Sequence, residues 1–203
     1  MRSNTWALLG ALLALSAAAL VAGCGGSDEG ASSAATAAGN PTDRAFVADM
    51  IPHHRSAVEM AAVAESEATS QFVKDLAADI TRSQNEEIGQ MQRVDAQLAK
   101  AGVEKGDLGM EDHAKGMDSS AQELRGAKPF DEKFIAMMLP HHESAVEMAR
   151  VELAKGENTE LKSLAEEIIK EQQREIKEMR AHTGDKTGGA AEMGSEHGSG
   201  HSG

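Results

Sequence analysis

The sequence predicts an all-α protein, a four-helix bundle built from two duplicated helical hairpins. Residues 41–92 and 129–180 align without a gap at a constant offset of 88 positions. Both copies are rich in Ala, Glu, Lys, Gln, Met and Leu, which favour helix, and they lack the alternating β-branched residues of strands. A repeat of this length is a duplicated supersecondary unit, and two helical hairpins pack naturally as a four-helix bundle.

The first residues of the chain are expected to be a lipoprotein signal peptide, residues 1–23. Arg2 precedes an apolar run from Trp6 to Ala22, and small residues lead directly into Cys24. This order is typical of a lipoprotein cleavage site. Cys24 is the only cysteine of the chain and is the expected lipidation site, carrying palmitate or a similar chain. We therefore expect a protein anchored to the membrane on the extracytoplasmic side of the bacterial cell envelope.

Flexible segments are expected on both sides of the folded part. Residues 24–40 are rich in Gly, Ser and Ala and should form a tether. Residues 183–203 form a Gly/Ser/His tail that cannot bury a core and should be disordered. Between them, residues 41–182 have the length of one domain. The net charge of −13 argues against a nucleic-acid partner and is compatible with attraction of cations.

Each copy is expected to contain two helices. The first helix of the first copy begins near Pro41 and runs to about Ala68. The second helix has a suitable N-cap in both copies, Ser70 in the first and Asn158 in the second. It ends before a glycine, near Lys100 in the first copy and near His182 in the second. The first helix of each copy also contains a proline directly before a His-His pair, which predicts a kink that re-aims the histidines.

The segment that joins the copies is expected to be looser. A short helix within it should begin at Asp118 or Ser119 and stop at Gly126. This segment, the end of the last helix and the tail also contain His and Met residues, which are candidates for auxiliary metal binding: Met110, His113, Met117, His182, Met193, His197 and His201.

Polar residues interrupt the apolar face of the helices at the same place in both copies. In the second helix of each copy, steps of three and four residues keep a Gln and a Glu on the face of the core residues. A buried Glu needs a partner, and histidines of the neighbouring helix or a metal ion would provide one. The candidate metal ligands form two matched sets: Met50, His53, His54, Met60, Gln84, Glu87 and Met91, and Met138, His141, His142, Met148, Gln172, Glu175 and Met179.

The types of ligand favour copper over other metals. Imidazole binds either oxidation state of copper, and thioether sulfur prefers Cu(I). Zinc would gain little from methionine. A di-iron carboxylate site in a helical bundle uses Glu-x-x-His motifs, which the predicted core helices lack. Copper is therefore the predicted cofactor, ahead of iron and zinc.

The His-His motifs resemble those of a bacterial family, the domain of unknown function family numbered three hundred and five. Its signature is similar to Phe46–Ala61 followed by Gln84–Met91, and the corresponding segments of the second copy match it again. The resemblance implies a ferritin-like helical bundle that is secreted or lipid-anchored. It also implies a link to copper binding and copper tolerance.

The function predicted from the sequence is copper sequestration, tolerance or delivery by a lipid-anchored extracytoplasmic protein. Its expected partners are the membrane, metal ions and another copper protein. A ferritin-like metal-dependent redox enzyme is the first alternative, with Glu87 and Glu175 as candidate proton-transfer groups. The second is a helical interaction module whose histidines form a structural polar core. Because single buried methionines more often fill a core than bind metal, the alternatives stay open.

Overall fold

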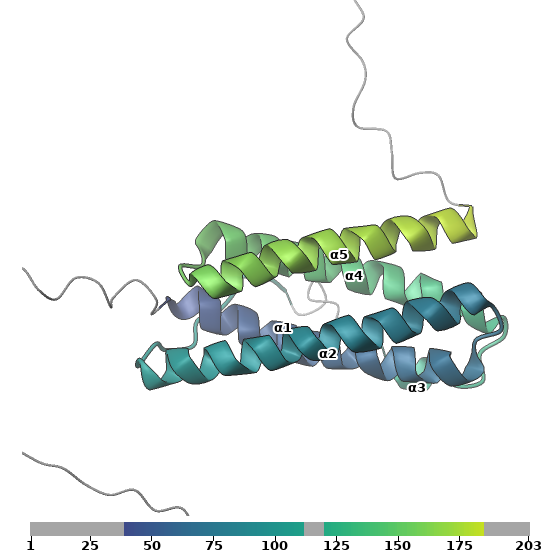
Figure 1. The fold of residues 1–203 in the computed structure, drawn as a ribbon, viewed down its shortest axis with the longest axis horizontal. Helices are drawn as coiled ribbons and strands as arrows, with labels where there is room; N and C mark the ends of the chain where they lie inside the picture. The colour runs from purple at the N-terminus through teal and green to yellow at the C-terminus, as the bar shows by residue number, and fades with distance from the viewer. Residues whose placement is uncertain (1–38, 112–119, 185–203) are drawn as a thin grey trace, which may run out of the picture. The chain divides into compact units, whose positions relative to one another are not determined.

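The computed structural model describes residues 39–111 and 120–184, and these residues are mainly helical (Figure 1). The helices are α1 (Pro41–Glu67), α2 (Gln71–Lys100), α3 (Ala121–Leu124), α4 (Phe130–Lys155) and α5 (Thr159–Thr183). The described residues contain no strand, so the predicted all-α class is confirmed. No helix in this part of the chain is long and apolar enough to cross a membrane. The predicted signal peptide, the tether up to residue 38 and the tail beyond residue 184 lie outside the described residues.

The four long helices lie side by side along a common direction (Figure 1). Helix α1 packs against α2 and helix α4 packs against α5, so each sequence copy lies in one antiparallel hairpin. The two hairpins meet mainly along α1 and α4. This arrangement is the predicted four-helix bundle, and it brings the His-containing helices of both hairpins together at its centre.

The helix starts follow the local sequence. Asn40 caps α1, because its side chain accepts hydrogen bonds from the backbone N–H groups of Thr42 and Asp43, and Asp43 in turn accepts from the Asn40 N–H. Ser70 and Asn158 cap α2 and α5, each accepting from the N–H three residues further on, as predicted.

Two expectations about the helices need correction or refinement. The N-cap of α3 is Ser120, whose hydroxyl accepts from the Gln122 N–H, and not Asp118 or Ser119, which lie outside the described residues. Helices α1 and α4 continue unbroken through Pro52 and Pro140.

Each hairpin holds the turn of the other through one aspartate. Asp43 on α1 accepts hydrogen bonds from the backbone N–H groups of residues 157–158, in the turn between α4 and α5, the shortest at 2.9 Å. Asp131 on α4 accepts from the N–H groups of residues 69–70, in the turn between α1 and α2, at 2.9 and 2.7 Å. All of these positions are related by the repeat offset, so the contacts obey a pseudo-twofold symmetry.

The second hairpin adds a buried carboxyl group to this contact. Glu152 on α4 is fully buried beside Asp43. Neither of its carboxyl oxygens has a hydrogen-bond partner among the described residues. Burial raises the pKa of Glu152 to about 9, and the adjacent Asp43 carboxylate adds to the effect. Glu152 is therefore neutral at neutral pH. A Cβ at Gly156 would lie 2.2 Å from the Glu152 Oε1, so glycine leaves the room for this side chain.

The core consists of two apolar clusters separated by a polar layer. We name the clusters after their central aromatic residues: the Phe134 cluster, with Met60, Leu76, Ile80, Met138 and Met179, and the Phe46 cluster, with Met50, Met91, Leu98, Met148 and Ile168. Each long helix contributes one stretch of residues to each cluster, and two polar side chains lie between these two stretches. These eight residues form the polar layer: His53, His54, Gln84, Glu87, His141, His142, Gln172 and Glu175.

Candidate metal centre

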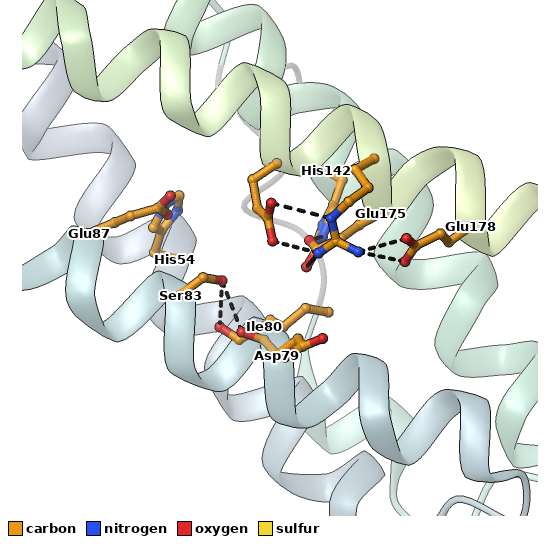
Figure 2. A network of polar contacts seen from close by, with 10 residues as sticks. His54, Asp79, Ile80, Ser83, Glu87, His142, Glu175 and Glu178 are labelled. Atoms are coloured by element: carbon orange, nitrogen blue, oxygen red, sulfur yellow. Dashed lines mark hydrogen bonds and ion pairs between the residues drawn. The ribbon is translucent and has the colours of Figure 1, made fainter.

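The polar layer contains two His–Glu pairs, one within each hairpin (Figure 2). His54 Nε2 lies 2.7 Å from Glu87 Oε2, and His142 Nε2 lies 2.6 Å from Glu175 Oε2. In both pairs the histidine comes from the first helix of the hairpin and the glutamate from the second. The predicted contact between the His-His helix and the Gln/Glu helix is therefore present in both halves.

The other two histidines meet at the centre of the bundle, between the hairpins. The rings of His53 and His141 have centroids 3.7 Å apart and planes inclined by 34°. His53 Nε2 lies 2.8 Å from the Ser144 hydroxyl, and that hydroxyl donates to the backbone carbonyl of His141 at 2.7 Å. Since the hydroxyl proton is used there, His53 Nε2–H must donate to Ser144. The Nδ1 atom of His53 is then left as an unprotonated acceptor.

Many polar atoms of the layer lack a hydrogen-bond partner within the described part of the chain. They include Nδ1 of all four histidines, Nε2 of His141, both polar side-chain atoms of Gln84 and Oε1 of Gln172. Buried polar atoms in native proteins nearly always have a partner, and groups without one call for an explanation such as an ion. The donor set is nitrogen and oxygen, which fits a transition-metal ion.

Three of the buried histidines, His53, His141 and His142, are held in the neutral form that binds metal. Burial lowers the pKa of His141 and of His142 to about 3, with the charges of neighbouring histidines adding to the effect. Burial and the adjacent His141 lower the pKa of His53 well below its usual value. Neutral imidazole has a free lone pair, so no proton has to be removed from these rings before a metal can bind.

Glu175 shows the opposite shift. Burial raises its pKa to about 8, and the nearby Glu171 carboxylate contributes in the same direction. The Arg174 guanidinium acts in the other direction, because it favours the carboxylate.

The predicted methionine ligands lie in the apolar clusters on both sides of the layer. Each cluster contains three of them, two from one hairpin and one from the other: Met60, Met138 and Met179 in the Phe134 cluster, and Met50, Met91 and Met148 in the Phe46 cluster. All six are fully buried. Among the described residues, no group of three or more His, Cys, Asp and Glu side chains is arranged to hold a metal ion. A complete set of ligands would need side-chain movement or the participation of amide or thioether groups.

The auxiliary candidates are not part of the polar layer where the structure describes them. Met110 is half-buried against the Phe46 cluster. His182 is exposed and stacks on Phe72, with ring centroids 4.1 Å apart. The remaining candidates lie outside the described residues, as does the predicted lipidation site: Cys24, His113, Met117, Met193, His197 and His201.

Two residues at the layer were missed by sequence reasoning. Ser144 follows the second His-His pair and contacts His53. A serine stands at the same place in the first copy, Ser56, and this recurrence could have indicated a role for the position. Arg174 lies with Nη2 at 3.4 Å from Glu175 Oε1. It has no counterpart in the first copy, so the repeat gave no indication of it.

Comparison with known proteins gives the same fold. The structure is similar to CopM in the Cu(I)-bound form, with a TM-score of 0.60 and 33% identity over 72% of this chain and 98% of that chain. For CopM in the Cu(II)-bound form the TM-score is 0.62, with 34% identity over 70% and 96% of the two chains. A DUF305 fragment from Deinococcus radiodurans matches with a TM-score of 0.59 and 30% identity, over 71% and 97%. No curated protein matches the chain.

A family model supports the same conclusion at the level of sequence. The model described as "Domain of unknown function (DUF305)" matches residues 43–183, a single match that covers both hairpins. That match spans more than half of the chain and includes the whole polar layer. The chain belongs to the DUF305 family.

Proposed function

We propose that this protein binds copper in the polar layer, and that it sequesters the metal or passes it on outside the cytoplasm. The observation that carries the proposal is the group of four buried, partly unpartnered histidines at the centre of the bundle. Three of them have a pKa that burial lowers. Burying so many polar rings without partners is costly for a purely structural core, and a bound metal ion would offset that cost.

The similarity to CopM supports copper as the metal. The CopM structures that this chain resembles include forms with Cu(I), Cu(II) or Ag bound. In this chain the two His–Glu pairs would supply nitrogen and oxygen ligands suited to Cu(II), and the central histidines would supply further nitrogen ligands. Methionines from the adjoining clusters would supply sulfur, which favours Cu(I).

Substitution of the four histidines tests the proposal. In a background with His197 and His201 changed to Gln, replacing His53, His54, His141 and His142 by Ala should abolish tight binding of both copper states. Binding is measured by competition with a chromogenic copper chelator, and helicity by circular dichroism. The pair of substitutions His54→Gln and His142→Gln, which nearly keeps side-chain volume, should also weaken binding and guards against misfolding of the fourfold variant.

Two results are decisive for this experiment. The substitution His182→Ala, on the exposed histidine outside the layer, serves as the matched control and should leave copper affinity unchanged. If the folded fourfold variant binds copper as tightly as its parent, the polar layer is structural and the proposed function is wrong.

We also propose that Cys24 carries a lipid anchor that keeps the protein at the membrane. The support is the order of small residues before this single cysteine. Cys24→Ser should move the protein from the membrane fraction to the soluble fraction of cells that express the full chain. A variant that still fractionates with membranes would contradict lipidation at this residue.

A further inference from the structure

We propose that the two His–Glu pairs bind copper with unequal affinity and that Arg174 causes the difference by holding the carboxylate of the second pair. This inference rests on the proposed function. Copper should therefore bind first at the His–Glu pair of the first hairpin and later at the pair of the second hairpin.

The symmetry of the polar layer is broken by one charged residue. All eight residues of the layer match between the copies in type and position. The residue before the glutamate does not match: it is Arg174 in the second hairpin and Glu86 in the first. The two pairs therefore have nearly the same ligands next to side chains of opposite charge.

Arg174 contacts the second pair directly. Its Nη2 lies 3.4 Å from Glu175 Oε1, while Oε2 of the same carboxyl group lies 2.6 Å from His142. Both oxygens of Glu175 are thus engaged. In the first hairpin, Glu87 Oε2 contacts His54, and within the described residues Glu87 has no ion pair with a lysine or arginine.

Two flanking carboxylates hold the Arg174 side chain in place. Glu171, one turn earlier on α5, contacts it at 2.5 Å, and Glu178, one turn later, contacts it at 2.7 Å. In Figure 2, Glu178 lies beside the His142–Glu175 pair, whereas His54 and Glu87 lie apart from it. Because the guanidinium group is fixed from both sides, it stays at the carboxylate rather than turning freely in solvent.

The two glutamates also differ in access to solvent. The Glu87 side chain is 12% exposed and the Glu175 side chain is 1% exposed. A metal ion from solvent can therefore reach a carboxylate oxygen of the first pair directly. At the second pair it has to displace the hydrogen bond of His142 or the contact of Arg174.

The charge of Arg174 also opposes a second cation nearby. A partly exposed charge–charge interaction is worth up to about 1 kcal/mol, which corresponds to a change in affinity of about fivefold. The arginine should weaken copper binding at the second pair by roughly this factor. Glu86, next to the first pair, acts in the opposite direction.

The test uses two variants of the full chain that each keep one pair, with His197 and His201 changed to Gln. His142→Gln keeps the first pair and His54→Gln keeps the second. Cu(II) affinity is measured by chelator competition, with and without Arg174→Gln. The matched control is Arg180→Gln, which removes the same charge from the same helix, where Arg180 pairs with Glu143 at 2.6 Å.

We expect the first-pair variant to bind Cu(II) more tightly than the second-pair variant. Arg174→Gln should tighten binding about fivefold in the second-pair variant and leave the first-pair variant nearly unchanged. Arg180→Gln should have little effect in either. Glu86→Arg, which places the arginine beside the first pair, should weaken the first-pair variant by about the same factor.

Several results would overturn the inference while leaving the proposed function intact. One such result is equal Cu(II) affinity of the first-pair and second-pair variants. Another is that Arg174→Gln does not tighten Cu(II) binding. A third is that Arg174→Gln and Arg180→Gln tighten binding equally, which would show an effect of net charge alone. If neither the parent nor either of these two variants binds Cu(II), the proposed function itself fails. If the first-pair or the second-pair variant does not fold, the parent is titrated with Cu(II) instead. The parent should show two binding steps of unequal affinity, and Arg174→Gln should make the two affinities more similar. Affinities that Arg174→Gln leaves unaltered reject the inference.

Discussion

The buried carboxyl group of Glu152 should make the protein less stable as the pH rises, and Glu152→Gln should remove this effect. Glu152 is buried beside the Asp43 carboxylate, and burial raises its pKa to about 9. The glutamine side chain has nearly the same shape and carries no charge at any pH. The substitution therefore keeps the packing and removes the titration.

The size of the effect follows from the two pKa values. Between pH 4.5, the ordinary value, and about 9, the folded state keeps a proton that the unfolded state has lost. The free energy of unfolding therefore falls by about 1.4 kcal/mol for each pH unit in this window. At pH 7 the accumulated cost is at most about 3 kcal/mol. Glu152→Gln should stabilise the protein by up to this amount at pH 7 and by almost nothing below pH 4.5.

Urea denaturation at a series of pH values from 4.5 to 8.5 measures the difference between the parent and the variant. The matched control is Glu147→Gln on the same helix, where Glu147 is exposed and pairs with Arg150; its effect should stay within about 0.5 kcal/mol at every pH. The reasoning is refuted if the stabilisation by Glu152→Gln is independent of pH, or if the variant is less stable than the parent at pH 7 and above.

Three further predictions concern the turn contact, the histidines and the methionines. Asp131→Ala removes the acceptor for the turn between α1 and α2, so urea denaturation should show a loss of about 1–3 kcal/mol; a loss near zero would contradict the role of this contact. The lowered pKa of His141, about 3, means that the metal-free protein loses stability as the pH falls below 6.5, where the unfolded chain takes up the proton. His141→Gln should reduce that loss in acid denaturation, and an unchanged acid profile would show that this ring stays solvated. Replacing Met60 and Met148 by Leu should weaken Cu(I) in competition assays and leave Zn(II) nearly unchanged, whereas equal weakening of both metals would argue for a packing role.

The pairing of histidine and glutamate within each hairpin could be predicted from the sequence, because it depends on helix periodicity. Steps of three and four residues place Glu87 on the apolar face of its helix, and a buried Glu needs a partner from the neighbouring helix. The repeat then supplies the same pair a second time. The fold class follows from the same pattern and needed no tertiary information.

The contacts between the hairpins could not be predicted in the same way. The ring contact between His53 and His141 and the hydrogen bond of His53 to Ser144 depend on how the hairpins approach each other, which periodicity does not fix. Glu152 has Ala64 as its repeat mate, so comparison of the copies gave no sign of its partner. The start of α3 was misplaced because Asp118, Ser119 and Ser120 are all suitable N-caps, and local propensity cannot choose among them.

The aspartate contacts between the hairpins have a consequence for assembly. Asp43 and Asp131 each accept hydrogen bonds from a turn that belongs to the other hairpin. In an isolated hairpin the aspartate would therefore lack its backbone donors, and the turn would lack its acceptor. Each His–Glu pair, by contrast, is complete within one hairpin. Two chains that exchange their second hairpins would rebuild both aspartate contacts and retain both pairs. The geometry of this bundle is thus that of a symmetric dimer of hairpins within one chain, and a domain-swapped dimer could keep the same interactions.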